Sequence, residues 1–226
     1  MVGLLLVADV QCQVGEEVIF QDSFKDAGGE GGVLLGETSP TIGDAYSGQG
    51  TLFSQEGAAT EKGDILAAFA GRSFVKPENA SFDSLVWNIS KWSQELTASG
   101  VVTVSFDFYM KNRGGAAKGM IGIISFSDSA TGGRGWDISL KEDGSASWWD
   151  GQDFHQTEIQ FDVDKVVPFK LVVDFPKRSY VATIGEESFS GTLVDGGQGV
   201  RRIMFYNSTG VEFYYADPKV AVAPER

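Results

Sequence analysis

The stretch that decides the fold runs Pro168-Phe-Lys-Leu-Val-Val-Asp-Phe175, then Pro176-Lys-Arg-Ser179, then Tyr180-Val-Ala-Thr-Ile-Gly185. Its first and last parts are rich in β-branched and aromatic residues, which favour strands. The four residues between them start with a proline, which cannot donate to a strand ladder, and continue with two basic residues that favour water. The stretch therefore predicts a β-hairpin, and the hairpin predicts an antiparallel sheet.

Most of the remaining chain has the same character. The strongest alternation lies in Val101–Met110, where Val102, Val104, Phe106 and Phe108 share one face. Pro218 falls inside the last apolar run, which predicts an edge or a bulge there. A short helix is expected near 90–96. Further strands are expected at 17–24, 52–53, 65–69, 120–127, 136–140, 145–150, 158–163, 188–193, 200–207 and 211–222, so the chain is predicted to be all-β, a two-sheet antiparallel β-sandwich.

Length and the N-terminal run set the expected domain organisation. A chain of 226 residues suits one large sandwich, so residues 13–226 are predicted to form a single domain. Residues 1–8 form a short apolar run, and residues 1–12 fit the remnant of a secretory signal peptide, although a first strand explains them too. The run is far shorter than the roughly 20 residues that cross a bilayer, so no membrane insertion is expected. A cleaved signal predicts a secreted protein or one on a cell or particle surface.

The charge of the chain limits its partners. It carries 18 basic and 31 acidic residues, for a formal net charge of -13. Nucleic acid and anionic membranes both attract basic surfaces, so neither is an expected partner. The acidic balance favours solubility and neutral or cationic ligands, including calcium.

The N-terminal third carries a family resemblance. The order of a strand with Asp22 and Phe24, a loop, and then Leu35-Gly36, Pro40, Gly43 and Tyr46 resembles the start of domains in the concanavalin A-like lectin/glucanase (laminin G-like) superfamily. The closing strands also look like those of this superfamily. The resemblance implies a jelly-roll sandwich from residue 17 onward. These motifs are structural, so the resemblance itself implies no activity.

The resemblance also suggests a structural calcium ion. Jelly-roll modules of this kind often join their first and last strands through Ca²⁺. Asp22 on the first strand and Asp217 on the last are the candidate ligands. Calcium prefers six to eight oxygen ligands, and the sequence contains no Asp-x-Asp-x-Asp-Gly loop.

Aromatic and polar residues after the Asp-Gly-Ser turn form the candidate binding patch. Trp148 and Trp149 are neighbours and must face opposite sides of a strand, and Trp149 is predicted to lie on the open face. An exposed tryptophan can stack against a sugar ring while nearby amides and carboxylates bind its hydroxyls. The predicted ligand-binding residues are therefore Trp149, Asp150, Gln152 and His155. The turn 176–179 has neither an aromatic platform nor a carboxylate cluster, so no ligand is expected there.

Catalysis is a weaker hypothesis than ligand binding for the same region of the sequence. Retaining glycosidases of the superfamily often carry Glu-x-Asp-x-x-Glu on one strand, and the nearest match here is Glu158-Ile-Gln-Phe-Asp162-Val-Asp164, where the second acidic position is Gln160. By parity these side chains share one face of a strand. Glycoside hydrolysis needs two carboxyl groups about 5–9 Å apart. The weak catalytic candidates are Glu158, Asp162 and His155, the only histidine.

Three functions remain open from the sequence. The first is a secreted, non-catalytic, lectin-like protein that binds carbohydrate. The second is a structural, assembly or adhesion subunit, such as a coat or filament protein, which would form a homo-oligomer. The third is a polysaccharide hydrolase or lyase.

Overall fold

The computed structural model describes residues 16–22, 24, 33–35, 46–47, 50–53, 59, 62–78, 85–88, 100–114, 119–126, 133–194, 199–207 and 209–223. The expected signal remnant at 1–12 and the expected helix at 90–96 lie outside these residues. Within the described part of the chain, no helix is long and apolar enough to cross a membrane.

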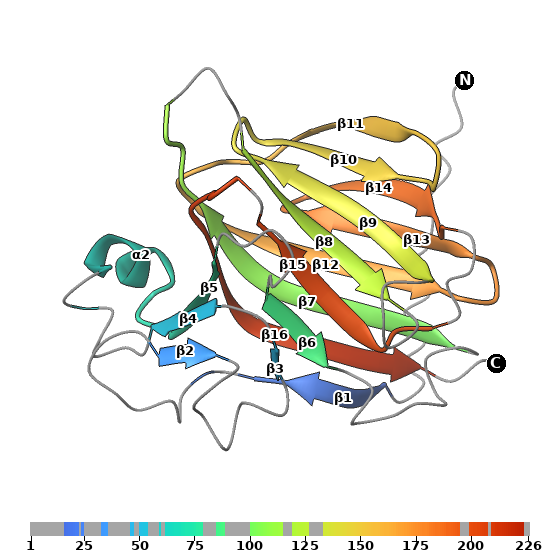
Figure 1. Cartoon of the computed structure of the whole chain (residues 1–226), viewed down its shortest axis with the longest axis horizontal. Helices are drawn as coiled ribbons and strands as arrows, with labels where there is room; N and C mark the ends of the chain where they lie inside the picture. Colours follow the sequence, from blue (N-terminus) through green and yellow to red (C-terminus); the bar gives the residue numbers. More distant parts are fainter. Residues whose placement is uncertain are drawn as a thin grey trace, which may run out of the picture.

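The protein is an all-β sandwich of two antiparallel sheets, one lying over the other (Figure 1). The larger, nine-stranded sheet has the order β14 (Glu187–Thr192), β13 (Ser179–Ile184), β12 (Val166–Asp174), β7 (Val101–Met110), β16 (Phe213–Ala223), β5 (Phe74–Pro77), β4 (Gly50–Phe53) and β2 (Val33–Leu35), with β1 (Glu17–Gln21) also paired to β16. The smaller, seven-stranded sheet has the order β11 (Phe154–Gln160), β10 (Ser145–Trp149), β9 (Arg134–Lys141), β8 (Met120–Phe126), β15 (Arg202–Tyr206), β6 (Leu85–Asn88) and β3 (Tyr46–Ser47).

The hairpin predicted at 168–185 is confirmed as β12 and β13. The two strands pair from Phe169 opposite Ile184 to Asp174 opposite Ser179, and the far side of β12 pairs with β7. The bulge expected at Pro218 is also confirmed. The register between β16 and β7 shifts between Ala216 and Lys219, because proline has no N–H to donate to the ladder.

Aromatic side chains fill the space between the sheets. Trp87 from the smaller sheet is fully buried against Phe106 and Tyr215 of the larger sheet, at ring-centroid distances of 5.9 and 5.5 Å. Phe205 stacks on Tyr215 at 4.7 Å. The alternation predicted for β7 is confirmed, because its even-numbered residues from Val102 to Phe108 all face this core.

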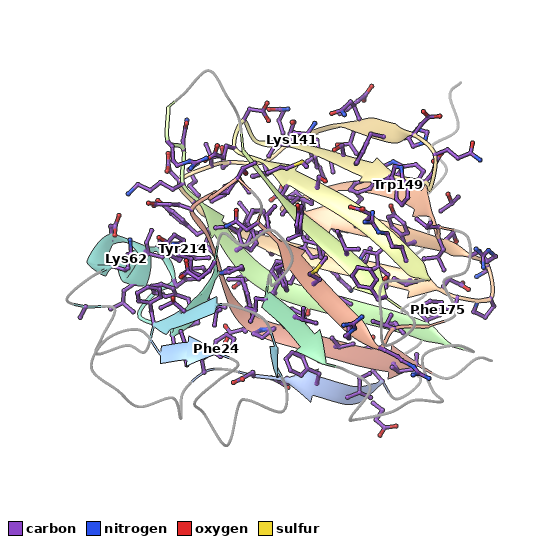
Figure 2. All side chains as sticks on the ribbon, in the orientation of Figure 1. Phe24, Lys62, Lys141, Trp149, Phe175 and Tyr214 are labelled. Atoms are coloured by element: carbon purple, nitrogen blue, oxygen red, sulfur yellow. The ribbon has the colours of Figure 1, made fainter. Side chains whose placement is uncertain are left out.

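The strand predicted at 65–69 is wrong. Residues Gly63–Ala68 form the helix α2, which lies at one end of the molecule beside β4 and β5 (Figure 1). Ile65 and Phe69 are four residues apart, so a helix places both on one face, where both are buried. They cover a second apolar cluster on the outer face of the larger sheet, which includes Tyr214 and is visible beside Lys62 in Figure 2.

Tyr180 connects the strand pair β13–β14 to the smaller sheet. It lies directly across from Gly191 in the register, and its ring lies over that glycine. The other side of the ring system meets Trp148 of β10 edge-on, with centroids 6.1 Å apart. The absence of a side chain at residue 191 is thus what allows the tyrosine to lie flat on its neighbouring strand.

We expect Gly191→Ala to destabilise the protein by about 1–3 kcal/mol, the usual cost of overpacking a core. A β-carbon at this position would lie 2.3 Å from the Tyr180 ring, well inside van der Waals contact. Urea unfolding measures the change. Gly122→Ala is the matched control, since a β-carbon there would lie at least 3.5 Å from its neighbours. Equal stability of the two variants would contradict the packing described for Tyr180.

Candidate functional site

The turn between β10 and β11 is held by one carboxylate. Asp150 accepts hydrogen bonds through Oδ1 from the backbone N–H groups of Gln152 and Asp153, at 2.7 and 2.8 Å. The backbone N–H of Asp150 donates to the Asp153 carbonyl at 3.2 Å. A side chain that bonds to the backbone two residues ahead is a common way to fix a turn. The turn that carries the predicted patch is therefore rigidly organised by Asp150.

His155, the second residue of β11, completes this arrangement. Its Nε2 atom lies 2.7 Å from Oδ2 of Asp150, so both oxygens of the carboxylate are occupied. The imidazole also stacks on Trp148, its partner in the register, with the rings 4.3 Å apart and inclined by 21°. Trp148 packs against the core, as predicted. The histidine thus joins the turn to the edge of the core.

These contacts lower the pKa of Asp150. The value falls to about 2, first because the Asp153 N–H bonds to the carboxylate and second because His155 does, with the Gln152 N–H adding to them. Hydrogen bonds to the charged form of a carboxyl group stabilise that form. Asp150 is therefore negatively charged throughout the physiological range and bonds to its own turn.

A hollow of about 720 Å³ lies beside this turn. One wall is the β10–β11 turn, with Asp150, Gly151 and Gln152. The opposite wall comes from the larger sheet, at the β12–β13 turn and the end of β14. The described residues that complete the lining are Lys177, Arg178, Thr192, Leu193 and Val194. The hollow thus opens where one hairpin of each sheet ends.

The sequence predicted no ligand at the β12–β13 turn. The structure places this turn in the wall of the hollow beside Asp150. Residues 177 and 178 are 27 and 28 positions after Asp150 in the sequence, yet they line the same hollow. The backbone N–H of Val194 donates to the Gly135 carbonyl at 2.9 Å, which ties the end of β14 to β9. No signal in the sequence links these turns, because the contact depends on how the two sheets pack.

Trp149 lies on the opposite side of β10 from Trp148, as predicted, and is partly buried. The guanidinium of Arg134 lies 5.0 Å from the centre of its ring. Asp137, a buried carboxylate, holds that guanidinium at 2.8 Å, and burial raises the pKa of Asp137. One face of the indole is therefore occupied by a cation–π contact, and Trp149 is less open than the sequence suggested.

Phe154 is the aromatic residue that sequence reasoning missed. It is 59% exposed and pairs directly with Trp149 in the register, with the ring centroids 6.5 Å apart. The hairpin itself supplied a signal, since residues paired across a tight turn share one face. Asp150 and Gln152 thus line the hollow, His155 supports Asp150, and Trp149 and Phe154 lie on the outer face beside them. Their role as ligand-binding residues stays a prediction.

The catalytic candidates are not brought onto one strand face. The strand predicted to reach Val163 ends at Gln160, so the parity argument for the later residues was wrong. Glu158 is exposed on β11, whereas Asp162 lies beyond the strand and pairs with Lys165 at 2.8 Å. Asp164 has a left-handed backbone, with φ 60°, and its carboxylate accepts from the Asn112 N–H. His155 is bonded to Asp150 instead of to either candidate.

The calcium candidates lie on neighbouring strands. β1 pairs with β16, and the backbone N–H of Asp22 donates to the Pro218 carbonyl at 3.1 Å. The carboxylate of Asp217 is ion-paired with Arg72, which also bonds to Asp107 at 2.8 Å. In the described part of the chain, no three His, Cys, Asp or Glu side chains form a group that would hold a metal ion. The calcium site stays a prediction.

Comparison with solved structures agrees with the architecture. The binding domain of botulinum neurotoxin serotype G is similar over 93% of this chain and 49% of its own, with a TM-score of 0.55 and 12% identity. A sialidase is similar over 77% of this chain and 15% of its own, with a TM-score of 0.45 and 14% identity. A Caenorhabditis elegans galectin is similar over 55% of this chain and 84% of its own, with a TM-score of 0.42 and 11% identity.

The chain therefore spans less than half the length of that toxin domain and of that sialidase. At 12% identity the similarity shows the fold alone, a two-sheet antiparallel β-sandwich, which agrees with the jelly-roll sandwich that the sequence resemblance implied. No model of a protein family matches the sequence, and no curated protein matches it.

We expect the carboxyl group of Asp150 to titrate with a midpoint of about pH 2 in an NMR pH series. Because its pKa is lowered in the fold, its bonds stabilise the turn above the ordinary value of 3.8 and weaken as the pH falls through about 2. His155→Ala removes one of these bonds and should move the midpoint upward. A midpoint near 4 in the unmodified protein would show that the turn is not held as described.

Proposed function

We propose that this protein binds carbohydrate without catalysing a reaction, and that the ligand contacts the β10–β11 turn. The turn has a hollow on one side and an exposed aromatic residue on the other. The secreted or surface location expected from the N-terminal run is part of the same proposal.

The size and lining of the hollow support this proposal. Its volume of about 720 Å³ lies within the range of about 300–1,000 Å³ that is typical of small-molecule sites. The Gln152 amide can donate and accept hydrogen bonds, and so can the Thr192 hydroxyl. Such groups match the hydroxyls of a sugar, which also donate and accept. The apolar residues Leu193 and Val194 provide a surface for the C–H groups of the ring.

Phe154 supports the proposal from the outer face. An aromatic ring that is more than half exposed loses contact with water when an apolar surface covers it. The C–H face of a pyranose is such a surface. The residue lies one hairpin pair from Asp150, so a ligand longer than one sugar unit can span the turn from the hollow to this ring.

The rigid turn is the observation that carries the proposal. Three hydrogen bonds fix the Asp150 carboxylate before any ligand arrives. A turn that is already ordered loses little conformational entropy on binding. A surface loop needs no such anchoring to connect two strands, whereas a binding loop gains affinity from it.

A glycan array tests the proposal. We expect the protein to bind a defined set of glycans, and we expect Gln152→Ala and Phe154→Ala each to weaken binding by about three- to tenfold, the loss expected for one hydrogen bond or one covered ring. Val181→Ala is the matched control for the phenylalanine, because Val181 is an exposed apolar residue on the larger sheet, away from the turn.

Two outcomes would contradict the proposal. No binding to any glycan on a broad array would favour the assembly function, which mass photometry would then reveal as large complexes. Binding that is equal in the Gln152, Phe154 and Val181 variants would place the carbohydrate site elsewhere on the protein.

A further inference from the structure

We infer that the ligand of the hollow is an acidic sugar, carboxylated or sulphated, and that Lys177 and Arg178 bind its anionic group. This inference rests on the proposed function and adds the chemical class of the ligand. Both residues belong to the β12–β13 turn and line the hollow opposite Asp150.

The described lining of the hollow carries two basic residues, Lys177 and Arg178, and one acidic residue, Asp150, in a protein that is acidic overall. The chain has 13 more acidic than basic residues, yet two consecutive basic residues lie at this one position. The carboxylate of Asp150 already accepts two backbone N–H groups and contacts His155, so both of its oxygens are bonded within its own turn, while its negative charge remains beside the hollow. An anion that enters the hollow meets the charges of the opposite wall.

The ion pair of Lys177 does not block this role. Its ammonium bonds to Asp174, three residues earlier, and the lysine side chain is 77% exposed. The Asp174 side chain is only 22% exposed, so it is the exposed lysine end of the pair that water solvates well. The lysine can therefore exchange its partner for an anionic ligand at small cost.

The backbone at Arg178 is the second observation. Its φ angle is 52°, in the left-handed region where a β-carbon is crowded and glycine is favoured. Three other hairpin turns of the chain do have glycine at positive φ, at Gly144, Gly151 and Gly185. In this turn the strained position carries a long cationic side chain instead. Strained backbone positions cluster at functional sites, and among the described residues Phe24, Ala70, Asp164 and Asp217 share this left-handed conformation.

The guanidinium of Arg178 is held at the wall of the hollow. Nη2 donates to the Val194 carbonyl at 3.2 Å, and Val194 lines the same hollow. The backbone also anchors the residue, because its N–H donates to the Phe175 carbonyl and its carbonyl accepts from the Leu193 N–H, each at 3.0 Å. A planar guanidinium fixed in this way suits the paired oxygens of a carboxylate or a sulphate.

The decisive variant is Arg178→Gly, because it separates binding from folding. Glycine relieves the left-handed strain but removes the bond to the Val194 carbonyl, and because these two effects oppose each other, the melting temperature should change little. Affinity for acidic glycans should fall about tenfold or more, the loss expected for a charge-assisted contact. Lys177→Ala should produce a smaller loss of the same kind. Lys170→Ala is the control, since it removes a positive charge from an exposed position of β12 that does not line the hollow.

The measurement uses an array that carries uronate-containing, sialylated and sulphated glycans beside their uncharged parents. Preference for carboxylated over sulphated members, or the reverse, identifies which anion the hollow takes. Binding should weaken as NaCl rises from about 0.05 to 0.5 M, because salt screens charge pairs, and this dependence should be smaller for Arg178→Gly.

The outcomes distinguish this inference from the proposed function. Equal binding of acidic glycans and their neutral parents, with Arg178→Gly unchanged and Gln152→Ala weakened, would overturn the inference and leave carbohydrate binding in place. No binding to any glycan would overturn both. A lowered melting temperature for Arg178→Gly would show that the arginine is retained for the fold.

Discussion

The hydrogen bond between Trp87 and Tyr215 is the contact on which the sandwich depends. The indole Nε1 donates to the tyrosine hydroxyl at 2.9 Å, and both side chains are fully buried between the sheets. A buried indole N–H without a partner would cost free energy, so this pair lets two large rings fill the centre. Burial raises the pKa of Tyr215 well above its ordinary value, which keeps the hydroxyl neutral. Phe106 and Phe205 close around the pair, and the spacing of the sheets follows from these four rings.

That spacing also determines the candidate site. The β12–β13 hairpin belongs to the larger sheet and the β10–β11 hairpin to the smaller one, so their turns meet only because the sheets are packed at a fixed separation. Tyr180 of the larger sheet and Trp148 of the smaller sheet also meet edge-on, which adds a second contact between the sheets. The charged residues that line the hollow also come from different sheets. The carboxylate lies on the smaller sheet and is bonded to its own turn, whereas the cations lie on the larger sheet.

Local patterns predicted the strands well and the site only in part. Alternation in β7 and the proline in β16 are properties of neighbouring residues, and both were interpreted correctly. Ile65 and Phe69 were misread because an apolar run of five residues fits a strand or a helix, and only the cluster beneath α2 decides between them. Asp150 and Gln152 could be placed at a turn because the hairpin itself brings them there. The cover of Arg134 over Trp149 and the approach of Arg178 to the hollow come from packing between strands and sheets, which no local pattern encodes.

The irregular pairing of β10 with β11 has a consequence for solubility. In the described strand order, β11 and β14 are the last strands of their sheets, and they lie next to each other. A flat edge strand is a template for intermolecular pairing, and β11 contains neither lysine nor proline to prevent it. Its register shifts between Ser145 and Ser147, however, so the strand is twisted out of a regular ladder. A bulge of this kind makes an edge strand a poorer template for pairing with another chain, while the neighbouring turn keeps its own regular hydrogen bonds.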